Sequence, residues 1–195
     1  MKHFIGSADL LQQVIRTSEE NNDIARAVTR DLNEAQLNWK PSAEQWSIAQ
    51  CLEHLALATN EFDKYFQVAL AQARTKPALN TAPVYKPTLM GGWLVKAVDP
   101  ATVRKLRAPK VFRPAAGSNI PQSLDLFLDA HTRFIAFVKQ CGGVDYNKAR
   151  LRSPVTPLVR YSLADAFVIT VLHGRRHLAQ ARRVREMPEF PRSET

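Results

Sequence analysis

The sequence has little cysteine and no long apolar run, and each shortage excludes a class of protein. Its two cysteines, Cys51 and Cys141, are too few for a disulfide-rich secreted scaffold or a four-cysteine zinc site. The N-terminal segment has no apolar core of the signal-peptide kind, and no stretch of about 20 apolar residues occurs anywhere. We therefore expect a cytoplasmic protein with no membrane partner.

Acidic residues are scarce relative to basic ones. The chain has 27 Lys and Arg against 18 Asp and Glu, a formal net charge of +9. Residues 86–113 alone hold seven basic residues and one acid, Asp99. Because no aromatic residues alternate with these charges and no nucleic-acid-binding motif is present, we do not expect a nucleic acid partner. A basic rim around a pocket that accepts a small anion is the better interpretation.

Length and composition predict a single domain over residues 1–195. The chain has 195 residues, of which 45% are hydrophobic and 23% are charged. A chain of this length buries a complete core without disulfides or a structural metal. A bound metal ion is therefore expected to serve function rather than folding.

Glycine is also rare, with seven in the chain, and the apolar residues recur at three- and four-residue spacing. Both features argue against a sheet and predict an all-α protein. Two helix starts are marked by a serine with a polar residue three positions later, Ser47 with Gln50 and Ser162 with Asp165. The spacing predicts four helices, over residues 7–37, 48–73, 121–140 and 162–186.

A proline-rich segment separates the second and third predicted helices. Residues 76–121 contain seven prolines, too many for one long helix, and we expect short helices at 89–98 and 102–106 within this segment. The expected fold is a four-helix bundle with a long crossover between the second and third helices. A crossover of this length allows the two helices that it joins to run parallel.

Histidines are the most informative polar residues. His173 and His177 are four residues apart on the fourth predicted helix, so their side chains share one face and can share one ion. A third ligand has to come from another element. His54 can supply it, because it lies among the apolar residues of the second predicted helix.

Several alternatives remain open for these and neighbouring residues. Two histidines at this spacing more often lie on the surface, or form a buried hydrogen-bonded pair, than bind a metal ion. His131 is a fourth ligand or a core residue, and His3 belongs to the terminus. Cys51 is a ligand or a small core residue, and Glu61 is a base or a solvated carboxylate. We expect the side chains of Arg175 and Arg176 to be exposed.

Three segments resemble the DinB-like superfamily. Residues 39–54 read WKPSAEQWSIAQCLEH, residues 108–114 read APKVFRP, and residues 173–180 read HGRRHLAQ. The resemblance implies a four-helix bundle, often a homodimer, with a metal ion bound by one histidine of the second helix and two of the fourth. Carried over by motif, these are His54, His173 and His177. Members of the family are not expected to bind DNA.

The resemblance also implies a class of chemistry. Some members resemble transferases that use small thiols such as bacillithiol or mycothiol, and others resemble metal-dependent hydrolases. Three neutral imidazoles suit zinc or nickel and leave a coordination position open, so that the pKa of a bound water or thiol falls. We expect a metal-dependent thiol transferase or hydrolase with a small anionic or thiol substrate. The alternative is a non-catalytic metal-binding or stress-related helical interaction module.

Overall fold

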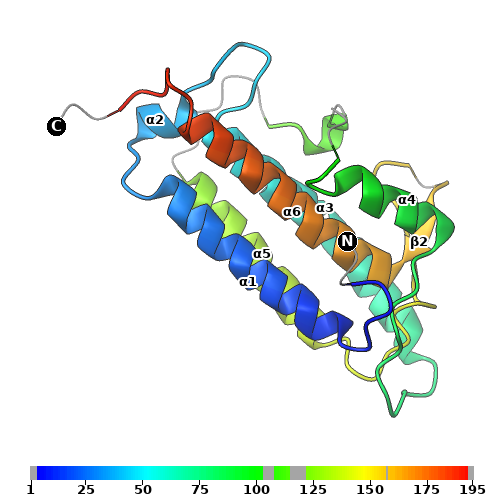
Figure 1. Ribbon diagram of the computed structural model, residues 1–195. Coiled ribbons are helices and arrows are strands. Elements are labelled where there is room, and N and C mark those ends of the chain that lie inside the picture. Colours follow the sequence, from blue (N-terminus) through cyan, green and yellow to red (C-terminus); the bar gives the residue numbers. More distant parts are fainter. Residues whose placement is uncertain (1–3, 103–107, 115–121, 157, 193–195) are drawn as a thin grey trace.

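The computed structural model describes residues 4–102, 108–114, 122–156 and 158–192, and four long helices dominate it (Figure 1). Helix α1 contacts both α5 and α6, and α3 contacts the same two, so each helix of the bundle has two neighbours. This confirms the predicted helical bundle. The four helices are α1 (Leu10–Thr29), α3 (Ile48–Arg74), α5 (Ser123–Lys139) and α6 (Leu163–Arg185).

The helices are paired in parallel, as two hydrogen bonds between helix ends show. At the end of α3, Arg74 donates from Nη2 to the Gln140 carbonyl just after α5, at 3.0 Å. At the end of α6, Arg185 donates from Nη1 to the carbonyl oxygens of Ala27 and Val28 near the end of α1. Helices α3 and α5 therefore run in one direction and α1 and α6 in the other (Figure 1). The long crossover does join two parallel helices.

The two predicted helix starts are confirmed. The Ser47 hydroxyl accepts from the backbone N–H of Gln50 at 3.1 Å, and the Gln50 side chain accepts from the backbone N–H of Ser47. Ser162 and Asp165 form the same reciprocal pair at the start of α6. These reciprocal pairs are capping boxes, and each one provides acceptors for backbone N–H groups that have no partner within the first turn of the helix.

The first predicted helix, over residues 7–37, is wrong in its extent. Helix α1 ends at Thr29, and a separate short helix, α2 (Glu34–Asn38), follows. Between them Asp31 has φ 60°, a left-handed conformation that no continuous helix tolerates. Asn33 then starts α2 with a capping box of its own, because its side chain accepts from the backbone N–H of Gln36.

The described part of the crossover contains one of the two short helices that the sequence predicts. Helix α4 (Leu89–Val98) matches the expected range, and a 3₁₀ turn, η1 (Lys110–Phe112), follows later. In the predicted helix over 102–106, Thr102 is not helical and residues 103–106 lie outside the described residues. The start of the crossover is fixed to α6, because buried Asp165 accepts from the hydroxyls of Tyr85 and Thr88 at 2.9 and 2.8 Å.

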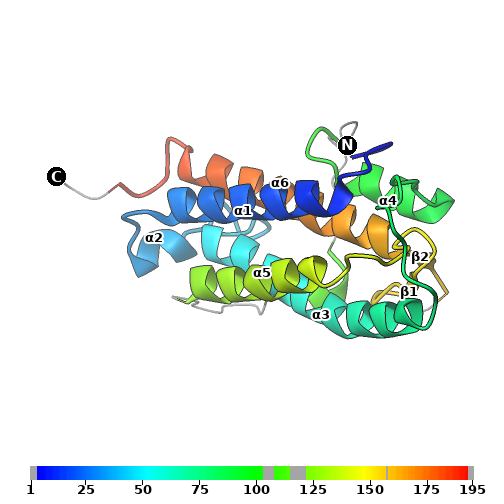
Figure 2. The same cartoon turned by 90° about the horizontal axis from the view of Figure 1, so that it is seen from below.

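A small antiparallel hairpin was not predicted. Strand β1 (Arg150–Arg152) pairs with β2 (Arg160–Ser162), and β2 leads directly into α6. Leu151 and Tyr161 face the core, and the arginines beside them are exposed. Figure 2 shows the hairpin and α4 at the same end of the bundle.

The core lies between the four long helices, and α6 is buried on nearly all sides along its first half. Its residues from Leu163 to Leu172 are all buried. Within the described part of the chain, no helix is both long and apolar enough to cross a membrane.

Candidate metal centre

Three histidines from two helices meet inside the bundle. His54 lies in the second turn of α3, and His173 and His177 lie on successive turns of the neighbouring α6. The centroids of the three rings are 4.9, 4.5 and 4.7 Å apart, so the rings form a nearly regular triangle. One ring nitrogen of each lies within 4.8 Å of the other two. The structure thus brings together all three predicted ligands.

The donor set fits a divalent transition metal. Nε2 of His54 and Nε2 of His173 are 3.0 Å apart. Imidazole nitrogens about 2.1 Å from a shared ion stand about 3.0 to 3.4 Å from one another, so this pair is already at the spacing that an ion requires. Imidazole is a ligand that zinc and nickel both accept.

Two of the rings are oriented by hydrogen bonds from their other nitrogen. Nδ1 of His54 is 2.6 Å from the carbonyl oxygen of Phe112. Since a carbonyl oxygen only accepts, Nδ1 carries the proton and Nε2 keeps its lone pair for the cluster. Nδ1 of His177 donates in the same way to Oε1 of Gln180, at 3.0 Å. Such contacts fix the tautomer that binds a metal ion.

Burial keeps the three imidazoles neutral. Desolvation, with a smaller contribution from neighbouring His54, lowers the pKa of His177 to about 3. Desolvation also lowers the pKa of His173 well below its usual value and lowers the pKa of His54, although the bond to Phe112 opposes the shift at His54. Only the neutral imidazole has a lone pair for a metal, so the cluster is in its binding form at neutral pH.

The three histidines differ in their exposure to solvent. His54 is only 2% exposed, whereas His173 and His177 are half-buried and reach solvent. The ring of Trp46 lies 4.8 Å from the ring of His54 and 5.6 Å from that of His177. The ring of Phe112 also lies beside that of His54, with ring centroids 6.5 Å apart. Trp46 therefore contacts two rings of the cluster, and the exposure that the cluster has comes from His173 and His177.

Trp46 and Phe112 were not identified from the sequence as residues of the site. Trp46 precedes the N-cap of α3, and a residue at that position folds back over the first turn of its helix. That signal predicts a contact between Trp46 and Cys51, which lies one turn before His54. No sequence signal points to a backbone carbonyl such as that of Phe112.

The crossover is fixed beside the centre by α6. Nη1 of Arg176 donates to the carbonyl oxygens of Asp99 and Thr102, at 3.2 and 2.8 Å. The expectation that Arg175 and Arg176 are exposed is therefore wrong, because both are half-buried. Arg175 donates to Asn21 and forms an ion pair with Glu20 on α1.

The remaining candidates lie outside the cluster. His131 is buried beside Phe127, with ring centroids 4.1 Å apart, and is a core residue. Cys51 is fully buried, and desolvation raises the pKa of its thiol to about 12, which disfavours a thiolate ligand. Glu61 forms an ion pair with Lys64 along α3. His3 lies outside the described residues.

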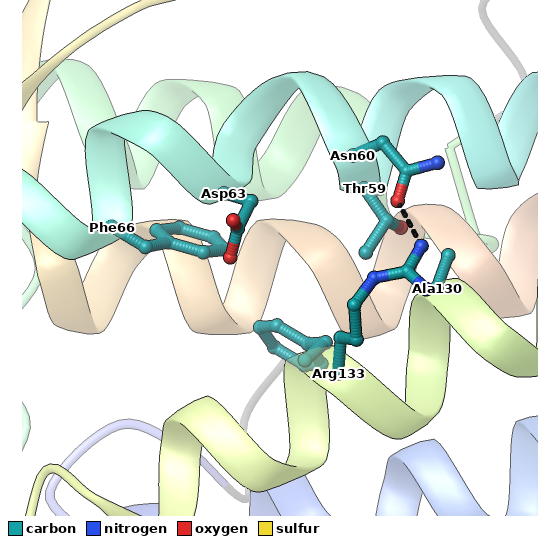
Figure 3. Close-up of a pocket in the computed structure, with 7 residues that line it drawn as sticks. Thr59, Asn60, Asp63, Phe66, Ala130 and Arg133 are labelled. Carbon is teal, nitrogen blue, oxygen red and sulfur yellow. Dashed lines mark hydrogen bonds between the residues drawn. The ribbon is translucent and has the colours of Figure 1, made fainter.

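A pocket elsewhere on the molecule does not extend the site. It lies between α3 and α5, and none of the three clustered histidines lines it (Figure 3). Nη2 of Arg133 donates a hydrogen bond to Oδ1 of Asn60 at 2.8 Å. Two of the polar groups that line the pocket are therefore already hydrogen-bonded to each other.

Known proteins resemble the chain in sequence and in fold. Uncharacterized protein YuaE of Bacillus subtilis (strain 168) is 30% identical over 164 residues, which cover 82% of this chain and 90% of YuaE. The structure of YfiT from Bacillus subtilis, described as a probable metal-dependent hydrolase with an unusual four-helix bundle topology, is similar with a TM-score of 0.55. That similarity covers 92% of this chain and 88% of YfiT at 19% identity, and it shows the fold. A family model of the DinB superfamily matches residues 18–181. The chain belongs to the DinB superfamily.

Proposed function

We propose that His54, His173 and His177 bind one divalent transition metal ion, zinc or nickel, and that the protein is a metal-dependent hydrolase or thiol transferase. The observation that carries the proposal is the convergence of three neutral imidazoles, two of them oriented by a hydrogen bond from Nδ1. When bound, an ion with an open coordination position acts as a Lewis acid and lowers the pKa of a water or thiol there.

The residues around the three histidines would each contribute differently to metal binding and catalysis. Phe112 and Gln180 hold the proton on Nδ1 of their histidines, so that Nε2 stays available. Trp46 limits the access of bulk water to the imidazoles. Arg176 holds the crossover beside the centre. The exposed Lys110 and Arg113 give this part of the crossover a positive charge, which favours a small anionic substrate.

The hydrolase and the thiol transferase differ in the nucleophile. The fold shared with YfiT supports the hydrolase, since that protein is described as a probable metal-dependent hydrolase. The motif resemblance supports the transferase. A second candidate, metal binding without turnover, is favoured by the cluster itself, because its three members are histidines with no carboxylate among them to act as a general base.

The test is turnover by one preparation in three states: metal-free, reloaded with zinc, and reloaded with nickel. Each state is assayed with small anionic esters and amides, and with bacillithiol, mycothiol and glutathione plus an electrophile. We expect turnover only after reloading, and none in a His173→Gln variant that keeps its helical circular dichroism. A His131→Gln variant is the matched control, because His131 is a buried histidine outside the cluster. Absence of turnover in both reloaded states would overturn the enzyme proposal and favour metal binding without catalysis.

A further inference from the structure

Helix α4 exposes large apolar side chains to solvent. Leu89 is 96% exposed, Trp93 58% and Met90 40%. In the loop between β1 and β2, Leu158 is 94% exposed and Val155 49%. Scattered exposed leucines are normal on a soluble protein, whereas large apolar side chains gathered on neighbouring elements mark an interaction site.

The orientation of α4 is fixed, so it cannot rotate to bury these side chains. Thr88, its N-cap, is held by Asp165 at the start of α6. A β-carbon placed on Gly91 would lie 2.1 Å from Cγ of Asp165, so this face of the helix is in direct contact with α6. Leu89, Trp93 and Lys96 follow one another at four- and three-residue spacing, so they form one stripe on the exposed side.

Three exposed arginines lie on the adjacent hairpin. Arg150, Arg152 and Arg160 are exposed on its outer face, and Arg152 stands directly opposite Arg160 in the strand register. Like charges directly opposite each other are destabilising. Among the described residues none of these arginines is paired with a carboxylate. An anionic partner would offset their repulsion.

The apolar stripe and the arginines lie at the same end of the molecule. Strand β2 contacts α4 directly. Figures 1 and 2 both show α4 and the hairpin side by side at the end of the bundle where α6 begins. We call this region the α4–hairpin surface and define it by Leu89, Met90, Trp93, Lys96, Arg150, Arg152, Leu158 and Arg160.

We propose that the α4–hairpin surface docks the protein on membranes that contain anionic lipids. Tryptophan and leucine beside lysine and arginine are the combination with which peripheral segments settle at the boundary between headgroups and acyl chains. Each basic residue near an anionic leaflet adds to binding, and the tryptophan ring suits the interface. The lack of a membrane-spanning segment led us to expect no membrane partner, but peripheral docking requires no such segment.

Charge makes a second copy of the chain a poor occupant of this surface. The surface as defined contains four basic residues and no acidic residue. A symmetric dimer through it would place one basic rim near the other, with no carboxylate from the same surface to compensate. A lipid surface supplies the negative charge and the apolar layer together.

Sedimentation with vesicles tests the proposal on the full chain. One set of vesicles is phosphatidylcholine alone, and the other contains about one third phosphatidylglycerol. We expect the native chain to sediment with the anionic vesicles, far less with the neutral ones, and progressively less as salt rises. Leu89→Ser/Trp93→Ser and Arg152→Glu/Arg160→Glu should each weaken binding on the order of tenfold or more.

Matched controls change equally exposed residues outside the surface. Val68→Ser alters an apolar residue on α3 that is 58% exposed, and Arg30→Glu/Lys139→Glu reverses two exposed charges elsewhere. Both should bind as the native chain does. If either test variant fails to fold by circular dichroism, Lys96→Glu replaces it, because that side chain is exposed.

Three results would overturn the proposal. One is no binding to the anionic vesicles, and another is equal binding by the test and control variants. The third is a native dimer, measured by light scattering, that Leu89→Ser/Trp93→Ser converts to a monomer, because the surface would then join two copies of the chain. None of these results bears on the histidine cluster.

Discussion

At the scale of single residues, Gln180 makes metal affinity depend on a side chain that is not itself a ligand. Its Oε1 accepts from Nδ1 of His177 and so keeps that ring in one orientation. Gln180→Leu removes the acceptor, and we expect metal binding to weaken by about 10- to 100-fold with little change in helical content. Titration of the metal-free variant with zinc measures this. Gln72→Leu on the exposed surface of α3 is the control, and equal affinities in the two variants would contradict the orienting role.

The buried His131 should make the fold sensitive to acid. Burial lowers the pKa of His131 from 6.5 to about 4. The unfolded chain therefore takes up a proton at this residue as the pH falls below 6.5, and the folded chain does so only near pH 4. The free energy of unfolding therefore decreases between pH 6.5 and about pH 4. At pH 5 this side chain alone has lowered it by about 2 kcal/mol.

Urea unfolding of metal-free protein at pH 7 and pH 5 tests this sensitivity. His131→Leu should lose about 2 kcal/mol less between the two conditions than the native chain, because it has no group to protonate. The site histidines are the same in both proteins and cancel in the comparison. An identical pH dependence in the two proteins would show that His131 does not carry the effect.

The ligands could be predicted from the sequence because they follow helical geometry. His173 and His177 are one turn apart, and His54 occupies an apolar stripe, so each is placed by the spacing of its own helix. The orienting contacts of Phe112 and Arg176 were missed because they depend on the path of the crossover. Any residue type can supply a backbone carbonyl, so the sequence does not identify the carbonyl of Phe112 as a partner. An arginine is expected to be exposed to solvent unless a partner for it is known.

At the scale of elements, two adjacent glycines in α4 should respond in opposite ways to alanine. At Gly91 a β-carbon would lie 2.1 Å from Asp165, whose carboxylate is buried and fixed by several hydrogen bonds. We expect Gly91→Ala to destabilise the protein by about 2 kcal/mol or more. At Gly92 the nearest atom is 3.4 Å away, and alanine is the better helix former, so Gly92→Ala should be neutral or stabilising by up to about 1 kcal/mol.

Chemical denaturation of the two alanine variants measures the difference. The pair is matched in chemistry and in helix, so the comparison isolates the contact between Gly91 and Asp165. Equal stabilities would mean that α4 does not pack against α6 as closely as the structure shows.

The elements that could not be predicted are short. The hairpin has three residues in each strand, too few to show the alternation of a strand. The break after Thr29 was hidden because apolar spacing continues across it to residue 37, although the capping box of Asn33 and Gln36 was a usable signal. Capping boxes at Ser47 and Ser162, by contrast, placed the starts of α3 and α6 correctly.

At the scale of the whole molecule, the crossover and the candidate metal centre depend on the same helix. Asp165 holds the start of the crossover, and Arg176 holds its middle, both from α6. Phe112 then reaches His54 on α3. The parallel pairing of α3 with α5 requires a long connection, and this connection passes beside the histidines. The bundle therefore brings the crossover, with the exposed Lys110 and Arg113, close to the histidines.

Calorimetric titration of the metal-free protein with zinc and with nickel measures whether the three histidines bind one divalent ion. We expect about one ion per chain for at least one of the two metals. His54→Gln and His177→Gln should each remove tight binding while helical circular dichroism persists, and His131→Gln should bind as the native chain does. Failure of the native chain to bind either metal, or undiminished binding by the His54 and His177 variants, would contradict a three-histidine metal site.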